Sequence, residues 1–172
     1  MTLQAITVIG HDRPGIIAET TRILAGLGLN LEDSTMTLLR GHFAMMLVCE
    51  GSVLSAEIEQ ALSGLTADGS LTVTVREVPE ESRPEAVGAS YVLTVHGGDR
   101  PGIVSAVAAE VARVGGNITD LTTRLSGEMY VLVAEVDIPA GVDVAALQTA
   151  LDGVAADLGV GVSLRQLEAD DL

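Results

Sequence analysis

An internal repeat is the feature that most constrains how this chain can fold. The pentapeptide Asp-Arg-Pro-Gly-Ile begins at Asp12 and again at Asp99, an offset of 87 residues. Further residues coincide at the same offset without a gap: Asn30 with Asn117, Asp33 with Asp120, Thr35 with Thr122 and Phe43 with Tyr130. The chain is therefore two copies of one folding unit, and its 172 residues suffice for two small domains.

Each copy shows the same succession of expected elements. A short apolar strand precedes the pentapeptide, and a helix follows it, with apolar residues at helical spacing up to a terminal glycine. A hairpin, a second helix and a last strand complete the copy. The expected strands are residues 3–10, 30–39, 42–50 and 71–78, then 90–97, 117–125, 129–137 and 160–167. This βαββαβ order predicts an α+β fold of two tandem ferredoxin-like domains, each an antiparallel sheet with its helices on one face.

The segment between the two copies is rich in Pro, Glu and Gly. This composition suits a solvated linker. We expect one domain over residues 1–78, a linker over 79–89 and a second domain over 90–172.

The hairpin strands 42–50 and 129–137 are largely apolar on both of their faces. A sheet covered on one side only should instead alternate apolar and polar residues. We therefore expect the second face, or the sheet edge, to be buried by the other repeat or by another chain. A two-fold homodimer is the commonest way to do this.

Composition and charge exclude several classes of function. The net charge is −15, from 24 acidic and 9 basic residues, so direct binding of DNA or RNA is not expected. No apolar run approaches the roughly 20 residues of a membrane span, and we expect no membrane partner. The N-terminus lacks a secretory pattern, and the single Cys49 excludes a disulfide framework. We expect a cytoplasmic protein in which Cys49 is a small buried hydrophobe.

Catalytic and metal-binding patterns are missing from the sequence. The glycine-containing loops match neither a Walker A loop nor a dinucleotide fingerprint. The three histidines fall at non-equivalent positions of the repeat and show no ligand-like spacing. We therefore expect no enzymatic activity, no catalytic residues, no cofactor and no metal.

The repeated pentapeptide suits the start of a helix. Its proline fits the first helical position, its aspartate can accept hydrogen bonds from the first turn, and its glycine leaves the backbone bare. These residues are Asp12, Pro14 and Gly15 in the first copy and Asp99, Pro101 and Gly102 in the second. Such a helix start can bind a carboxylate, although a well-capped turn explains the same residues. Because alanine is the better helix former, alanine at either glycine is expected to preserve or raise stability.

The pentapeptide between a strand and a helix, followed by an Asn at the next strand, resembles the ACT domain. This family consists of small βαββαβ modules that sense amino acids, and the resemblance covers nearly the whole chain. It implies domains paired side by side or back to back, with an effector at the interface. The implied ligand-binding residues are Asp12, Pro14, Gly15, Ile16 and Asn30, and Asp99, Pro101, Gly102, Ile103 and Asn117. Glu32 stands where the second copy has Thr119, so we expect the two sites to differ in affinity, or one of them to be empty.

A regulatory function follows from the resemblance. Chains made of two ACT domains resemble the glycine cleavage system transcriptional repressor group. The implied protein binds a small amino acid, with glycine as one candidate, and acts on a protein partner such as a transcription factor or metabolic enzyme. A regulatory subunit of an amino-acid metabolic enzyme is the alternative.

Overall fold

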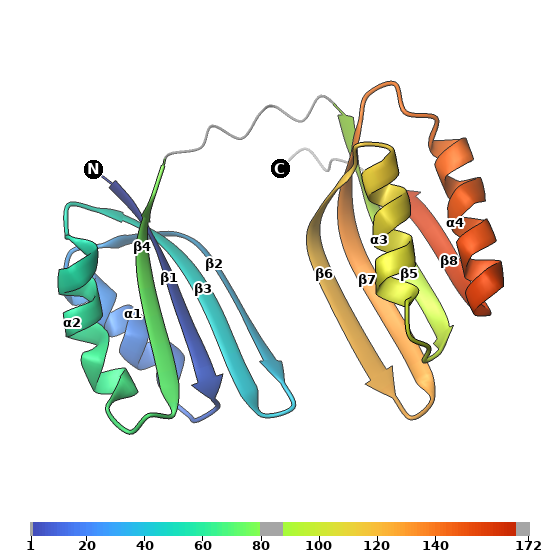
Figure 1. Ribbon diagram of the computed structural model, residues 1–172. Helices are drawn as coiled ribbons and strands as arrows, with labels where there is room; N and C mark the ends of the chain where they lie inside the picture. The colour runs from blue at the N-terminus through green and yellow to red at the C-terminus, as the bar shows by residue number, and fades with distance from the viewer. Residues whose placement is uncertain (1, 80–87, 168–172) are drawn as a thin grey trace. The chain divides into compact units, whose positions relative to one another are not determined.

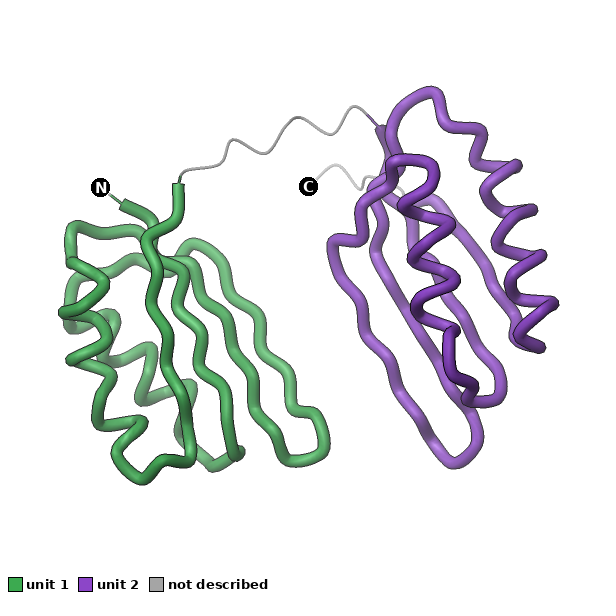
Figure 2. Tube along the Cα trace, viewed as in Figure 1, with its two compact units in different colours: residues 1–82 green, residues 83–172 purple. Residues whose placement is uncertain are grey.

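The structure, a computed structural model, describes residues 2–79 and 88–167. It divides into two compact units, Met1–Ser82 (unit 1) and Arg83–Leu172 (unit 2), coloured separately in Figure 2. Both units show the element order βαββαβ, which confirms the predicted fold class.

Unit 1 is a four-stranded antiparallel sheet with two helices. Its elements are β1 (Thr2–His11), α1 (Ile16–Gly26), β2 (Asn30–Leu39), β3 (His42–Gly51), α2 (Ser55–Thr66) and β4 (Leu71–Val78). The strands lie in the order β2-β3-β1-β4, so β2 and β4 form the edges. Both helices cover the same face of the sheet (Figure 1).

Unit 2 repeats this arrangement. Its elements are β5 (Gly88–Gly98), α3 (Ile103–Arg113), β6 (Asn117–Ser126), β7 (Met129–Pro139), α4 (Val144–Leu158) and β8 (Val160–Gln166). The strand order β6-β7-β5-β8 matches that of unit 1. The two edge strands also share an irregularity in their pairing. The register shifts between Leu31 and Asp33 in β2 and at the equivalent place, between Ile118 and Asp120, in β6.

Each unit has its own apolar core between the sheet and the helices. Alternate residues of the two central strands point into it, among them Ile6, Leu47, Leu93 and Ala134. These side chains are at most 1% exposed, and the apolar faces of both helices close over them. In each unit, the apolar residues at helical spacing and the apolar residues that alternate along the strands therefore pack against each other in one core.

Within the described residues of each unit, no helix lies over the opposite face of the sheet. Met46 of β3 and Val133 of β7, which are equivalent in the repeat, are 45% and 41% exposed there. That this face or the sheet edge is buried by another domain stays a prediction.

The predicted linker 79–89 falls mostly on residues 80–87, which lie outside the described residues. Its last two residues, 88 and 89, belong to β5. No helix in the two described stretches is long and apolar enough to cross a membrane.

Cys49 lies in the core of unit 1, as predicted, and is 1% exposed. Burial raises the pKa of its thiol, and the negative charge of Glu32 raises it further. The thiol is therefore protonated at neutral pH and out of reach of solvent, so it is no nucleophile.

We expect Cys49 in the native protein to resist modification by dithiobis(nitrobenzoate) at neutral pH and to react fully in denaturant. A control with an exposed thiol, Thr35→Cys in a Cys49→Ala background, should react at once in the native state. Rapid modification of native wild-type protein would show that the core of unit 1 is not packed as described.

Candidate functional site

The repeated pentapeptide forms the connection between the first strand and the first helix of each unit. In unit 1, β1 ends at His11 and α1 begins at Ile16, so Asp12 to Gly15 make the connection. The N–H of Asp12 donates to the carbonyl of Gly41, in the β2–β3 hairpin, at 3.0 Å. The loop is thereby fastened to the hairpin at one end of the sheet.

The Pro-Gly pair forms a tight turn before the helix. Gly15 has φ 92° and ψ −5°, and Gly102 has φ 97° and ψ −7°. These angles belong to the third residue of a type II turn, a position that glycine favours and that proline commonly precedes. The prediction that Pro14 and Pro101 take the first helical position is therefore wrong, because each helix begins two residues after its proline.

The left-handed backbone at Gly15 also changes the expected effect of alanine. A β-carbon at Gly15 would meet no neighbouring atom within 4 Å, so space is not limiting. The conformation itself costs an L-residue about 1–2 kcal/mol. The expectation that alanine preserves or raises stability at this glycine is wrong, because the residue precedes the helix in a conformation that favours glycine.

The first turn of each helix presents backbone N–H groups that no side chain caps. The N-cap residues are Gly15 and Gly102, and among the described residues no side chain accepts a hydrogen bond from the first turn of α1 or α3, so the predicted capping by Asp12 and Asp99 is wrong. The N–H of Glu19 donates to the carbonyl of Gly15, and the N–H groups of residues 16–18 have no acceptor within the helix. A helix start of this kind favours negatively charged groups.

The two loop arginines have different surroundings. Nη2 of Arg13 lies 3.3 Å from Oε2 of Glu19, and both side chains are more than a third exposed, so this ion pair adds little stability. The Arg100 guanidinium instead lies beside Gly159, the C-cap of α4, where a β-carbon would sit 3.6 Å from it. There it faces the negative end of a helix.

An open hollow of about 390 Å³ lies between the loop and the sheet of unit 1. It is lined by Asp12, Arg13, Gly15, Ile16, Ile17, Ala18, Met36 and Phe43. The hollow brings together three predicted ligand residues, Asp12, Gly15 and Ile16. The other five were not predicted as ligand contacts, although Phe43 was noted as equivalent to Tyr130 in the repeat.

Asn30 lies at the opposite end of the sheet from this hollow. In the antiparallel β2–β3 pair, Asn30 is opposite Glu50 and Leu39 is opposite His42. His42 is in turn opposite His11, where the loop begins. Nine residues of strand separate the two ends, or roughly 30 Å. A single unit does not bring its asparagine to its own loop.

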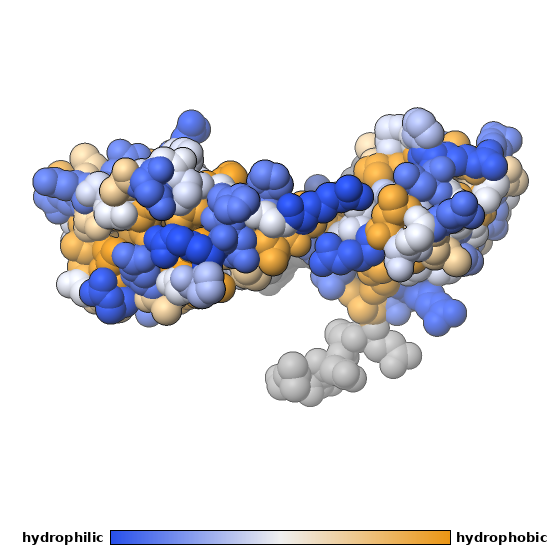
Figure 3. Space-filling model, turned by 90° about the horizontal axis from the view of Figure 1, so that it is seen from below, coloured by the Kyte–Doolittle hydropathy of each residue, from blue (hydrophilic) through white to orange (hydrophobic). Residues whose placement is uncertain are grey.

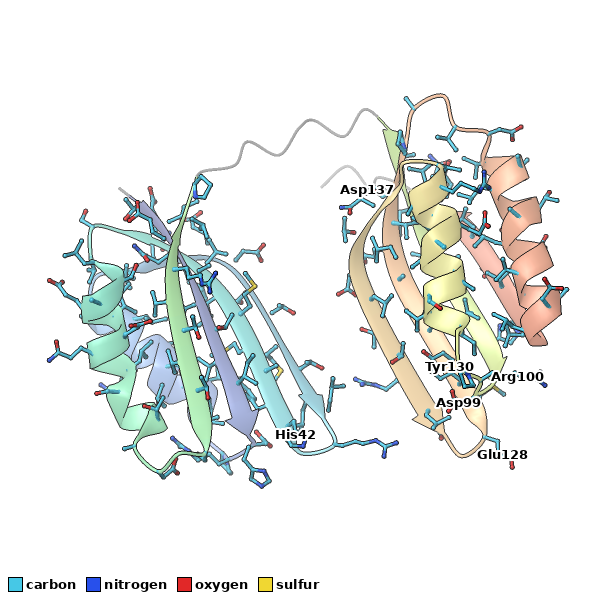
Figure 4. The ribbon with its side chains drawn as sticks, viewed as in Figure 1. His42, Asp99, Arg100, Glu128, Tyr130 and Asp137 are labelled. Atoms are coloured by element: carbon cyan, nitrogen blue, oxygen red, sulfur yellow. The ribbon has the colours of Figure 1, made fainter. Side chains whose placement is uncertain are left out.

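Unit 2 shows the same separation. Asp99 lies at the hairpin end of the sheet with Glu128 and Tyr130, whereas Asp137 lies at the other end (Figure 4). Asp137 is the register partner of Asn117. The predicted ligand residues of each copy therefore form two groups at opposite ends of a unit.

The Asn30 end of unit 1 is acidic. Nδ2 of Asn30 donates to Oε1 of Glu32 at 2.6 Å. A second hollow at this end, of about 430 Å³, is lined by Glu32, Glu50 and Glu77 together with Thr2 and apolar residues. Carboxylate and amide oxygens of this kind can accept hydrogen bonds from an ammonium group.

The edge strands β2 and β6 are exposed almost throughout. In β2 every residue except Thr37 is exposed, and in β6 every residue except Ile118 and Thr123. Leu38 and its equivalent Leu125 are both 46% exposed. An edge with free backbone groups and apolar side chains is a template for pairing with another strand.

Apolar surface also gathers at the loop end of each unit. Ile17 of α1 and its equivalent Val104 of α3 are 44% and 38% exposed. Viewed from this end, each unit shows apolar patches between hydrophilic residues (Figure 3).

The described residues contain no cluster of three or more His, Cys, Asp or Glu side chains able to hold a metal ion. His11, His42 and His96 are exposed. The rings of His11 and His42 meet edge to face at the hairpin end of unit 1, with their centroids 6.4 Å apart.

A family model described as ACT domain matches residues 3–76 and again residues 90–165. The glycine cleavage system transcriptional repressor of Escherichia coli (strain K12) is 27% identical over 166 residues, which cover 92% of this chain and 87% of that protein. A UPF0237 protein of Listeria innocua is 38% identical over 64 residues, 37% of this chain and 72% of the relative. A crystal structure of an unknown protein from Galdieria sulphuraria superimposes with a TM-score of 0.81 at 28% identity, covering 97% of this chain and 99% of that one.

Proposed function

This chain belongs to the ACT-domain family, with one domain in each repeat, and from that membership we propose that it is a non-catalytic regulatory protein that binds a small amino acid and acts through a protein partner. The observation that carries the proposal is the hollow beside the repeated loop in unit 1. One of its walls is the uncapped start of α1, and another is apolar.

The loop offers complementary groups to both charged ends of an amino acid. The free N–H groups of residues 16–18 suit the carboxylate, because they point outward at the positive end of a helix. The Asp12 carboxylate does not cap that helix, so it can accept hydrogen bonds from the ammonium group. The proposed ligand-binding residues are Asp12, Pro14, Gly15, Ile16 and Asn30, and Asp99, Pro101, Gly102, Ile103 and Asn117.

The two asparagines can complete such a site only from another domain. If two edge strands pair antiparallel, the start of one strand lies beside the end of the other, and an asparagine then approaches the loop of its neighbour. We propose that this neighbour is a second copy of the chain, with the effector at the interface between the two.

The charges along β6 support pairing of this strand with its own copy. Asp120 is opposite Glu135 within its own sheet, and like charges directly opposite each other are unfavourable. An antiparallel β6–β6 pair centred on Thr122 would place Arg124 of the second copy beside Asp120, and the reverse. The same pairing would carry Asn117 toward the loop end of the second copy.

The proposed regulation of genes acts through a protein partner and not through direct contact with DNA. The relative from Escherichia coli is named a transcriptional repressor and aligns over nearly the whole chain, which favours a regulator over an enzyme subunit. The net charge of −15 opposes direct contact with DNA phosphates. A transcription factor of amino-acid metabolism is the partner we propose, and deleting the gene in its host should change transcript levels of glycine cleavage genes.

Alanine at the loop glycines should weaken amino-acid binding. The ligand is first found by a thermal-shift screen of the twenty amino acids, in which a concentration of 100 Kd adds about 2.7 kcal/mol of stability. Calorimetric titration should then show the affinity falling by about tenfold or more in Gly15→Ala and in Gly102→Ala, a loss of about 1.4 kcal/mol per tenfold. The reason is a methyl group beside the backbone N–H groups that receive the carboxylate.

Gly69→Ala is the matched control, because Gly69 also has a left-handed φ, 74°, and open space for a β-carbon. Gly15→Ala and Gly69→Ala should each lower stability by about 1 kcal/mol. Only Gly15→Ala should affect binding. Full affinity in the Gly15→Ala/Gly102→Ala double variant would contradict the proposed site.

Charge reversal in β6 should control self-association. Asp120→Arg or Arg124→Asp alone should shift the protein toward monomer in sedimentation velocity, because each places like charges across the proposed pair. The double variant should restore the dimer. Asp157→Arg, at an exposed position of α4, applies the same change of charge away from the edge and should have no effect. A dimer that survives both single reversals would exclude this pairing.

A further inference from the structure

The hollow beside the unit 1 loop is lined by eight residues, and the two units differ at half of them. The loop set recurs unchanged: Asp12, Arg13, Gly15 and Ile16 correspond to Asp99, Arg100, Gly102 and Ile103. At the fifth position Ile17 becomes Val104, which keeps it apolar. The remaining three, here called the divergent positions, gain a hydroxyl group in unit 2: Ala18 becomes Ser105, Met36 becomes Thr123 and Phe43 becomes Tyr130.

Two of the divergent positions occupy equivalent places in the two sheets, and the third, Ala18 or Ser105, lies in the first turn of the helix. Met36 of β2 is opposite Met45, and Thr123 of β6 is opposite Leu132, its equivalent partner. Phe43 is likewise opposite Leu38, as Tyr130 is opposite Leu125. The two strand positions therefore keep their register in unit 2, and the side chains that they carry differ in chemistry.

The polar groups of unit 2 are available at the surface. Ser105 Oγ donates its hydrogen to the carbonyl of Gly102 at 3.0 Å, which leaves the oxygen free to accept. Tyr130 is half-buried where Phe43 is only 2% exposed. Tyr130 also lies at the same end of the unit as Asp99 and Arg100 (Figure 4).

The corresponding wall in unit 1 is apolar. Ile17 is 44% and Met36 45% exposed, so both side chains are uncovered beside the loop. The volume of about 390 Å³ lies at the lower end of the range of about 300–1,000 Å³ typical of small-ligand sites.

We propose that the two units select different amino acids: unit 1 takes one with an apolar side chain, and unit 2 takes one whose side chain carries a hydroxyl or another hydrogen-bonding group. This inference rests on the proposed function, in which both loops bind amino acids. The unchanged loop set contacts the ammonium and carboxylate groups that all amino acids share. The divergent positions contact the side chain, in which amino acids differ.

The selectivity has a simple physical cause. A hydroxyl group that enters an apolar wall loses its hydrogen bonds to water and gains none. An apolar group that covers the hydroxyls of unit 2 leaves those hydroxyls without partners. Both penalties oppose the wrong ligand.

The test uses the full chain with binding at one loop weakened at a time. Gly102→Ala leaves the unit 1 loop intact, and Gly15→Ala leaves the unit 2 loop intact. Each variant is titrated calorimetrically with valine and threonine, which share a shape and differ by a methyl or a hydroxyl group. We expect Gly102→Ala to prefer valine and Gly15→Ala to prefer threonine, each by about tenfold or more.

Exchange of the divergent positions should transfer the preference. In the Gly102→Ala background, the combined substitutions Ala18→Ser, Met36→Thr and Phe43→Tyr should turn the preference toward threonine. Because Phe43 is buried and its substitution affects the core, the reverse exchange is a second test. In the Gly15→Ala background, Ser105→Ala, Thr123→Met and Tyr130→Phe should turn the preference toward valine, and thermal melts establish that both proteins fold.

The outcomes separate this inference from the proposed function. Equal preference in the two single-loop variants, or a preference unmoved by the exchange in a folded variant, overturns the inference and leaves amino-acid binding standing. If wild-type protein binds none of the twenty amino acids, the proposed function falls, and the inference with it.

Discussion

Within the described residues of each unit, the helices cover one face of the sheet only, and the sheet ends in an exposed strand. β2 and β6 have a hydrogen-bonded neighbour on one side and free backbone groups on the other. Such edges are normally short, charged or covered, yet these are ten residues long and carry exposed leucines. The proposed pairing of domains, and the proposed completion of the effector site from a second copy, both follow from this incomplete coverage.

Much of the fold could be predicted because each helix and strand occurs twice in the sequence, so the two copies could be compared. The strands 30–39 and 71–78 were predicted with the bounds that the structure gives, since polar turns and glycines mark their ends. The start of the first helix was predicted two residues early. Proline suits both the first helical turn and the second position of a type II turn. Because the following residue, Gly15, has φ 92°, the proline belongs to a type II turn and the helix begins after it.

The candidate site was less accessible from sequence. The loop was found because it is duplicated. Met36 and Ile17 also line its hollow, but in the sequence they look like ordinary apolar residues of a strand and a helix. The distance between Asn30 and its own loop depends on strand register, which the hairpin fixes and which motif spacing does not reveal. Duplication also has a functional consequence, because one copy can keep the loop while the wall beside it diverges. Ala18, Met36 and Phe43 show this divergence when set against Ser105, Thr123 and Tyr130.

The central claim is that the effector lies between two copies of the chain, and thermodynamic linkage tests it directly. A ligand that contacts both copies must stabilise the dimer by the same factor by which dimerisation tightens the ligand. The measurement is sedimentation equilibrium of wild-type protein, with and without the strongest-binding amino acid at saturation. The account predicts that the dimer dissociation constant falls when the amino acid is bound. Saturating binding that leaves this constant unchanged would show that the site lies within one copy and would contradict the account.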